Sequence, residues 1–357
     1  MRFGRRVAPL AIIASCVVSA MPAQAAERIG LTVATGHPEV FPHVRFLKEV
    51  FVPEVDRLLE EAGGDYAVDW RQAYGGTLVR TGSELAAIQQ GILDIAFVPT
   101  LFSGSQLPLE QVTYQAPFLS PDDEVIRQAM TNVRSRFTEY GDAWATFGAT
   151  VLSAGNICDD YNLMLKEPAK NLADLDGRRI YAPGPTANRL KGTGAVAVAG
   201  NMSEYYQGLQ SGIADGVLVL TSAAFPGRYH EVAPNFVKVG LGAQWCSTIA
   251  INTQRLESLP DPVREAILAA AQAYSNDLMT AVNASMAQHL ENMQAEGATV
   301  IEWSHEARAE WATALPNIAH EWADAMVAQN LPGHEVLQAL QEEVVAAGAE
   351  PLRDWTR

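Results

Sequence analysis

The chain has 357 residues, of which 48 % are hydrophobic and 18 % are charged, and its formal net charge is −16. A composition this apolar excludes disorder over most of the chain, and the length allows two or three domains. The negative charge is spread along the sequence without a basic cluster, which argues against a nucleic-acid partner.

The first 25 residues have the pattern of an export signal. Three arginines precede and flank an apolar stretch at 7–21, and Ala23-Gln24-Ala25 has the small-x-small form of a cleavage site. The apolar stretch is short for a membrane span. We therefore predict a signal peptide over 1–25 that is cleaved near Ala25, and a mature protein in the periplasm. A retained anchor helix and a lipoprotein acylated at Cys16 are the alternatives.

The segment 26–150 is predicted to form a first α/β lobe. Its expected strands lie at 29–34, 66–70 and 92–98, and its expected helices at about 42–62 and 82–90. Pro53 lies inside the first helical pattern and predicts a kink or a break there. This β-α-β-α-β order is typical of a parallel sheet with helices on both faces.

One short phrase occurs twice, as Gln89-Gln90-Gly91-Ile92-Leu93-Asp94 and as Gln210-Ser211-Gly212-Ile213-Ala214-Asp215. Each copy ends a helical pattern at its glycine and then opens an apolar run of strand length. A helix, a terminating glycine and a buried strand make half of a βαβ unit. Two such halves predict two similar lobes, with a cleft between them that encloses a small molecule.

The second lobe is predicted at 151–250, with crossing strands near 145–166 and at 237–240 and 248–252. Its own expected elements are strands at 179–182 and 217–220 and a helix at 203–210. From Asp261 to Gly297, apolar residues at steps of three or four predict a helix of about 35 residues, long enough to span both lobes. The region 251–357 is thus expected to form this spine helix and further helices that pack on both lobes.

The mature chain keeps two cysteines, Cys158 and Cys246. Because an exported protein matures where disulfides persist, we predict a bridge between them, with two buried free thiols as the alternative. A metal site built on these two cysteines is not expected, since zinc takes four ligands.

The chain shows no set of residues typical of an enzyme. Its histidines lack the spacing that places two zinc ligands on one helix face, and neither a nucleophile elbow nor a Walker phosphate loop occurs. The segment 192–197 fits a dinucleotide-binding spacing, but its context predicts a helix end followed by a loop. We therefore expect no catalytic residue, no metal and no cofactor. An exported α/β enzyme and a ligand-sensing partner of a membrane receptor remain the rival functions.

A longer pattern occupies 171–216. It combines Asp174-Leu175-x-Gly177, Gly194-Ala195, Glu204-x-Tyr206 and Leu209-Gln210-x-Gly212-x-x-Asp215-Gly216. This combination resembles the solute-binding proteins of TRAP (tripartite ATP-independent periplasmic) transporters, and the resemblance covers roughly residues 28–330. It implies a two-lobed periplasmic-binding-protein-like fold (type II-like) with hinge strands and a long C-terminal spine helix. It also implies a cleft that captures a small organic acid for the permease subunits of the transporter. Nothing in the sequence requires more than a monomer.

Two positions depart from that family pattern. Gly208 replaces an alanine, and Tyr181 replaces an arginine that usually forms a bidentate pair with the substrate carboxylate. A phenol donates one hydrogen bond and offers a stacking face, but it does not neutralise a carboxylate. Either another arginine takes over, with Arg71 and Arg80 as candidates, or the ligand is an aromatic or otherwise planar acid. In the second case Tyr181 and Trp245 would form its pocket.

Ligands of open parallel sheets bind at the carboxyl ends of the strands. On this basis and from the resemblance, the candidate ligand-binding residues are His37, Gly76, Thr77, Arg80, Thr100, Asn156, Arg179, Tyr181 and Trp245. Structural roles are the alternatives: ion pairs for the arginines, a core position for Trp245, and local turn contacts for His37 and His43.

Overall fold

The computed structural model describes Met1 and residues 26–153 and 156–357, with the side chains of 156 and 157 left aside. The predicted signal peptide and the alternative roles of Cys16 lie outside these described residues, apart from Met1. Within the described part of the chain, no helix is long and apolar enough to cross a membrane.

The first lobe is built on a sheet with strand order β2-β1-β3-β11-β4, and β5 also pairs with β11. Strand β1 is parallel to β2 and β3, whereas β11 runs antiparallel to β3. The strands are β1 (Glu27–Ala34), β2 (Tyr66–Ala73), β3 (Ile95–Pro99), β4 (Ala149–Val151), β5 (Asn156–Cys158) and β11 (Gln244–Asn252). The predicted parallel core of this lobe is therefore confirmed, and β11 is an antiparallel strand added to it by the returning chain.

The expected break at Pro53 takes the form of a π-helical turn. Helix α1 (Pro42–Phe46) continues into this turn, Leu47–Phe51, and then into α2 (Val52–Glu61), where Pro53 is in the first turn. The Val52 N–H donates to Leu47 O, five residues back. Because proline lacks an N–H and its ring crowds the carbonyl four residues earlier, the wider turn lets the chain remain helical. Helix α3 (Glu84–Gln89) follows β2.

The second lobe is built on a mixed sheet with strand order β12-β10-β6-β9-β7-β8. Strand β6 is antiparallel to β9 and β10, and the pairs β7–β9, β7–β8 and β10–β12 are parallel. The strands are β6 (Tyr161–Leu165), β7 (Arg179–Tyr181), β8 (Val196–Val198), β9 (Gly216–Leu220), β10 (Asn235–Lys238) and β12 (Thr299–Glu302). Helix α7 (Tyr205–Ser211) connects β8 to β9.

Two sequence predictions for this lobe need correction. The segment 237–240 was expected in the return crossing, but β10 pairs with β6 inside the second sheet, and β11 is the returning strand. The segment 192–197 was expected to be a helix end and a loop, but its last residues start β8, which pairs with β7. Short strands of two or three apolar residues leave too weak a periodic signal for sequence reasoning.

The duplicated phrase marks equivalent places in the two lobes. Gly91 ends α3 with φ = 66° and Gly212 ends α7 with φ = 80°, and the strands that follow are β3 and β9. Both strands are buried along their whole length. The prediction of two related helix–glycine–strand units is thus confirmed.

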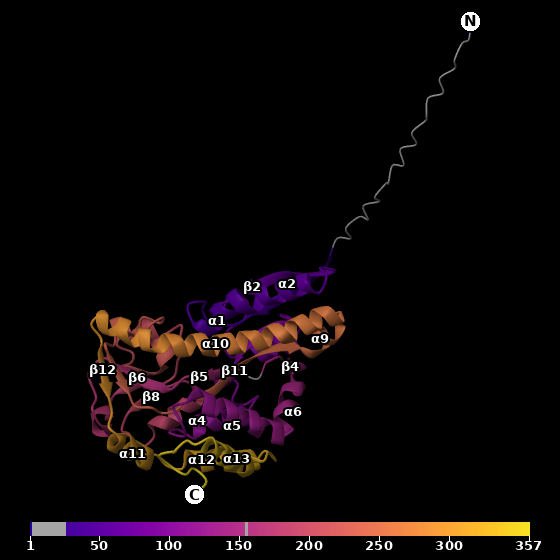
Figure 1. Cartoon of the computed structure of the whole chain (residues 1–357). Helices are drawn as coiled ribbons and strands as arrows, with labels where there is room; N and C mark the ends of the chain where they lie inside the picture. The colour runs from indigo at the N-terminus through magenta and orange to yellow at the C-terminus, as the bar shows by residue number, and fades with distance from the viewer. Residues whose placement is uncertain (2–25, 154–155) are drawn as a thin grey trace.

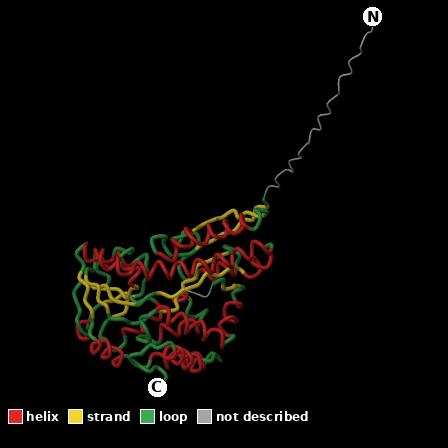
Figure 2. The backbone as a smooth tube through the Cα atoms, in the orientation of Figure 1, coloured by secondary structure: helices red, strands yellow, loops and turns green. Residues whose placement is uncertain are grey.

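The two sheets are joined by two extended crossings and one helix. The first crossing runs from β5 into β6 and the second from β10 into β11, while α10 (Asp261–Ala295) leads to β12. In Figures 1 and 2 the second sheet lies at the left and α10 runs across the molecule above both crossings. Helix α10 contacts α1 and α2 of the first lobe, and α8 (Thr221–Ala224) and β12 of the second. The predicted spine helix is confirmed.

Helices from the middle and the end of the chain pack together on the side opposite α10 (Figure 1). They are α4 (Val112–Gln115), α5 (Asp123–Arg136), α11 (His305–Ala314), α12 (Ile318–Val327) and α13 (Gly333–Ala346), whereas α6 (Glu139–Thr146) and α9 (Thr253–Ser258) contact strands of the first sheet. Helix α13 packs on α5 and α12 on α4, as Figure 1 shows. The Trp355 indole N–H donates to Pro117 O over 2.7 Å, so the C-terminus is tied to the segment that precedes α5. Helices α4 and α5 therefore share a core with the second sheet.

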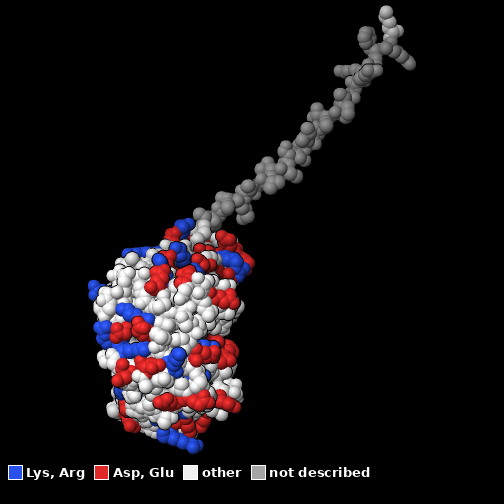
Figure 3. All heavy atoms as spheres, turned by 90° about the vertical axis from the view of Figure 1, so that its left-hand side faces the viewer, with Lys and Arg blue, Asp and Glu red and all other residues white. Residues whose placement is uncertain are grey.

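The surface carries charge of both signs. On the face drawn in Figure 3, acidic and basic side chains are interspersed, consistent with the spread of charge along the sequence. Several ion pairs of the molecule lie within one helix, such as Arg57 with Glu54 in α2 and Arg127 with Glu124 in α5. Exposed pairs of this kind contribute little to stability.

The predicted disulfide is present. Cys158 at the end of β5 and Cys246 in β11 are bonded, with their Cα atoms 5.6 Å apart. These strands are already paired, because Gln244 lies opposite Cys158 in their antiparallel register. The bond therefore joins the outgoing and returning crossings at the point where both leave the first sheet.

We expect the double substitution Cys158→Ser and Cys246→Ser to lower the free energy of unfolding by about 2–4 kcal/mol, because the bridge restrains a long loop of the unfolded chain. Urea denaturation would measure this. A thiol reductant should lower the stability of the wild type to the level of the double variant and leave the variant unchanged. Equal stability of oxidised and reduced wild type would contradict the prediction.

Candidate ligand-binding cavity

A cavity lies where the two sheets, the crossings and α10 meet. It offers about 70 Å³ to the centres of water-sized molecules. A single water needs roughly 10–15 Å³ by this measure, so the space holds several waters or a small organic molecule. Its lining is mostly apolar and aromatic. This combination of an enclosed apolar space and a few polar groups is typical of a small-molecule site.

Each lobe supplies one wall of the cavity. The first lobe contributes His37 after β1, His43 of α1 and the end of β3 from Phe97. The second contributes Leu218–Leu220 at the end of β9 and Ser222 of α8. Strands β1, β3 and β9 all point their carboxyl ends at the cavity, as expected for ligand sites in parallel sheets. The strands that follow the two copies of the duplicated phrase thus end at the same site.

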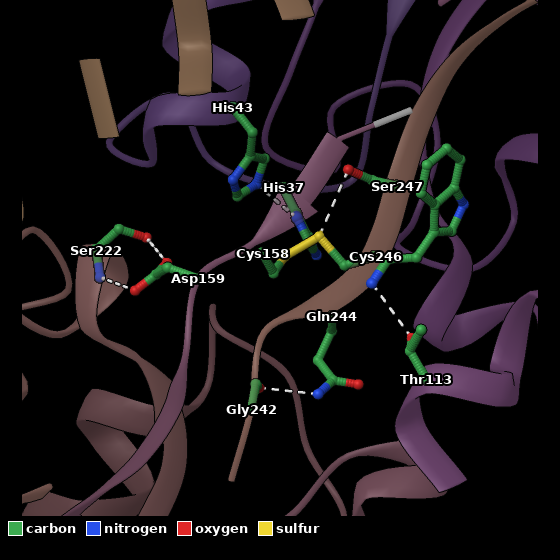
Figure 4. The surroundings of a disulfide bond; sticks show 11 residues. His37, His43, Thr113, Cys158, Asp159, Ser222, Gly242, Gln244, Cys246 and Ser247 are labelled. Carbon is green, nitrogen blue, oxygen red and sulfur yellow. Dashed lines mark hydrogen bonds between the residues drawn. A yellow bond between two sulfur atoms is a disulfide. The ribbon is translucent and has the colours of Figure 1, made fainter. Parts of the chain in front are cut away.

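The crossings and the spine helix complete the enclosure. Both disulfide cysteines, with Asp159 and Ser247 beside them, line the cavity, and α10 covers it with Leu278, Met279 and Val282. Figure 4 shows the disulfide with the polar groups arranged around it. The elements that cover the cavity thus belong to both lobes.

Two histidines form a neutral pair in the first-lobe wall. His37 Nδ1 lies 2.9 Å from His43 Nε2, so one ring donates to the other. The His43 ring stacks between Phe41 and Phe97, with centroid distances of 5.9 and 4.7 Å. Burial lowers the pKa of His37 to about 4, and burial and the neighbouring His37 lower the pKa of His43 well below its usual value. Within the described residues, His37 Nε2 is buried without a hydrogen-bond partner.

A buried carboxylate lies in the crossing that leads to the second lobe. Asp159 is 3 % exposed and accepts hydrogen bonds from the Ser222 N–H at 2.9 Å and the Ser222 hydroxyl at 2.5 Å. Burial raises the pKa of Asp159 to about 6, an effect that these hydrogen bonds oppose. Sequence reasoning missed both residues. An acidic pair directly after Cys158 was the available signal, but its burial depends on the crossing.

A buried guanidinium lies behind the tyrosines of the second-lobe wall. Arg189 is fully buried, and its Nε and Nη2 donate to the carbonyls of Tyr114 and Thr113 at 3.1 and 3.3 Å. Its guanidinium carbon lies 5.3 Å from the centre of the Tyr161 ring. Burial lowers the pKa of Arg189 to about 10, so it stays charged at neutral pH. Tyr114 and Tyr161 line the cavity and separate this cation from it.

The structure brings few of the predicted site residues to the cavity. Among the described side chains of that set, His37 alone is in the lining. Gly76, Thr77 and Arg80 are exposed in the loop after β2, and the further candidate Arg71 is exposed within β2. Arg179 is half-exposed and forms an ion pair with Asp215 at 2.8 Å. These residues therefore lie outside the cavity, and their predicted contacts with a ligand stay predictions. The carboxyl end of a strand marks one edge of a sheet, but the paths of the loops determine which residues return to that edge.

The other predicted residues lie near the cavity or in the core. Thr100 is buried between Pro99 and Leu101, which both line the cavity. Trp245 is buried in the core outside the cavity lining, with the Arg134 guanidinium 4.9 Å from its ring centre. Asn156 belongs to β5, but its side chain lies outside the described part of the structure.

The two departures from the family pattern meet in space. Tyr181 is 4 % exposed, and its ring lies under α7, 5.0 Å from the ring of Tyr205. A Cβ atom added at Gly208 would lie 1.9 Å from the Tyr181 hydroxyl oxygen. The missing methyl group of Gly208 therefore makes room for the phenol that replaces the arginine. Because Tyr181 occupies this space, it does not line the cavity.

Gly208→Ala should destabilise the protein by about 1–3 kcal/mol, because the new methyl group would overlap Tyr181 in a packed core. Gly141→Ala in α6 is the matched control, since a Cβ there meets nothing within 4 Å. The control should raise stability by about 0.5–1 kcal/mol, the usual gain for replacing a helical glycine by alanine. Chemical denaturation of both variants would measure this, and equal shifts would contradict the overlap.

The histidine pair predicts a pH dependence of stability. Since the pKa of His37 is about 4 when folded and about 6.5 when unfolded, the unfolded chain binds the proton first as pH falls. The contribution of His37 is complete above pH 6.5 and is lost progressively toward pH 4, by up to about 3 kcal/mol.

His37→Gln should reduce this loss, and His305→Gln, at an exposed position, should leave it unchanged. Denaturation curves between about pH 7 and 4 would show the difference. Parallel pH profiles for the wild type and His37→Gln would contradict the prediction.

Solved structures share this fold. The Bordetella pertussis extracytoplasmic solute receptor DctP7, which binds pyroglutamic acid, has a TM-score of 0.77 at 19 % identity, covering 88 % of this chain and 99 % of that one. A TRAP solute-binding protein from Rhodoferax ferrireducens, with copurified benzoate, has a TM-score of 0.78 at 17 % identity, covering 89 % and 98 %. The ectoine-binding protein of the TeaABC TRAP transporter from Halomonas elongata has a TM-score of 0.74 at 20 % identity, covering 89 % and 100 %.

A family model identifies the chain more directly than these distant structures. No curated protein matches the sequence significantly. The model described as "Bacterial extracellular solute-binding protein, family 7" matches residues 54–326, which is most of the chain. The predicted relationship to solute-binding proteins of TRAP transporters is therefore confirmed, and this chain belongs to family 7 of the bacterial extracellular solute-binding proteins.

Proposed function

We propose that this protein captures a small organic acid in the interlobe cavity and delivers it, chemically unchanged, to the permease subunits of a TRAP transporter. The observation that carries the proposal is an enclosed cavity with walls from both lobes, both crossings and the spine helix. Membership of an extracellular solute-binding family supports the same reading. Pyroglutamic acid and benzoate, the ligands of two structural relatives, are acids of a size that such a cavity accommodates.

The lining favours a solute with a flat or apolar body. Phe97, Phe102 and Tyr205 present aromatic surface to the cavity, and Leu218 and Met279 present aliphatic surface. Burial of apolar ligand surface contributes about 25 cal/mol per Å² and requires no directed contact. The polar ends of the solute then determine specificity, through the few hydrogen-bonding groups in the walls.

Delivery requires the lobes to open and close. The covering residues come from both lobes, so entry and release need a rotation about the crossings, while α10 bends or slides. A solute that contacts both walls favours the closed state, because it gains those contacts only when the lobes are together. The protein would work in the periplasm as a monomer after removal of the signal peptide. Release of a chemically unaltered solute would distinguish it from an enzyme, and mass spectrometry would check this.

Met279→Trp should block the cavity, because Met279 lines it from α10. We expect the affinity for any solute that copurifies with the wild type, and for benzoate as a probe, to fall by about tenfold or more, since overpacking a filled site costs 1–3 kcal/mol. Met286→Trp, further along α10 and outside the lining, should bind as the wild type does. Native mass spectrometry and calorimetry would measure both. Equal binding by the two variants would place the solute elsewhere.

A further inference from the structure

The charged groups that line the cavity are unusual for the capture of an anion. Among the described lining residues, the ionisable carboxyl groups are Asp123 and Asp159, and there is no lysine or arginine. The two histidines are neutral at physiological pH because burial lowers the pKa of each. Arg189, the buried cation nearby, lies behind Tyr114 and Tyr161; its Nε and Nη2 donate to main-chain carbonyls, and its Nη1 is buried without a partner within the described residues. A simple carboxylate would add negative charge to a cavity whose own lining has no cation, which buried sites strongly disfavour.

Asp159, in contrast, is a buried carboxylate without a cationic partner among the described residues. Its carboxylate is buried, and within the described residues its side-chain partner is the neutral Ser222. Figure 4 shows the hydrogen bonds between Asp159 and Ser222 beside the disulfide. Carboxylate oxygens accept more than one hydrogen bond each, so acceptor capacity remains for a solute. A buried carboxylate is most stable when a cation pairs with it.

We propose that the solute is a zwitterion, an organic acid that also carries a protonated nitrogen, with the nitrogen bound to Asp159 and the acid group bound to the histidine pair. This inference rests on the proposed function and specifies its class of solute. A zwitterion brings its own positive charge, so the cavity needs no arginine. Its N–H groups would form charge-assisted hydrogen bonds with Asp159, and the Tyr161 and Tyr205 rings could face the same cation.

The histidine pair suits the acid group. When His37 Nδ1 accepts from the His43 Nε2–H, the second His37 nitrogen carries its proton and becomes a donor. That Nε2 is buried and unpaired within the described residues. His37 and His43 belong to the first lobe, whereas Asp159 is hydrogen-bonded to Ser222 of the second lobe. The two ends of one zwitterion would thus bind opposite lobes and hold them closed.

A protonated Asp159 that donates to a plain carboxylate is the competing explanation, and pH separates the two. The titratable groups around Asp159 are Asp160 and Tyr161 beside it in the chain, Asp123 of α5 and the histidine pair in the facing wall; Arg189 and Arg308 lie behind. Since the pKa of Asp159 is about 6, affinity for a zwitterion should fall as pH decreases through 6. Affinity for a plain carboxylate should rise over the same range.

The experiment compares an amino acid, an acid and an amine that share one side chain. The mature protein, freed of copurified solute by unfolding and refolding, is titrated calorimetrically with leucine, 4-methylpentanoate and 3-methylbutylamine. A second set uses phenylalanine, 3-phenylpropanoate and 2-phenylethylamine. We expect at least one zwitterion to bind about tenfold or more tightly than its acid and its amine, which is the usual contribution of a hydrogen bond between charged groups. Its affinity should weaken from about pH 7.5 to pH 5.

Asp159→Asn should lower the affinity for that zwitterion by about tenfold and leave or raise the affinity for the acid. Asp65→Asn, an equal change of charge at an exposed loop, is the control and should bind as the wild type does. If Asp159→Asn does not fold, the pH profile of the wild type decides the question.

Acids that bind as tightly as their zwitterions, or a copurified solute without a basic nitrogen, would overturn the inference and leave the proposed function intact. Failure of every probe, with no copurified solute, would overturn both.

Discussion

The joining of the two crossings to each other is the constraint on which the rest of the structure depends. The disulfide joins β5 and β11, and the Leu241 N–H donates to Tyr161 O over 3.0 Å just beyond it. Asp160 adds a hydrogen bond from the Gly242 N–H at 2.8 Å. These contacts make the two strands one connection between the sheets. They fix where the lobes meet, and the cavity lies against them because both cysteines and Asp159 line it.

This arrangement also explains the unusual electrostatics of the site. A crossing must carry backbone from one sheet to the other, so polar groups near it become buried whether or not they bind a solute. Asp160 is satisfied within the crossing, by Gly242 and by the Asn162 amide at 3.2 Å. Its neighbour Asp159 turns to the cavity and to Ser222. Two adjacent carboxyl groups thus have different surroundings: Asp160 holds the connection together, and Asp159 faces the cavity.

Tyr181 and Gly208 are the two departures from the family pattern, and they are in contact. A tyrosine in place of an arginine carries no charge and has a ring that must be accommodated. The ring fits under α7 because residue 208 has no Cβ. The pair therefore links strand β7 and helix α7, at positions 27 residues apart in the chain.

Local pattern alone determined much of this protein. The spacing of apolar residues predicted α10, and the duplicated phrase predicted the related units around Gly91 and Gly212. The export signal and the two remaining cysteines predicted the disulfide between Cys158 and Cys246. Each of these signals is contained in a short segment or in the cysteine count. Only the tertiary structure determined which residues line the cavity. Asp159, Ser222 and His43 come from three distant segments, and Arg179 and Trp245 lie outside the cavity lining, in contact with Asp215 and Arg134. Burial and proximity depend on how the segments cross, and no single segment encodes that crossing.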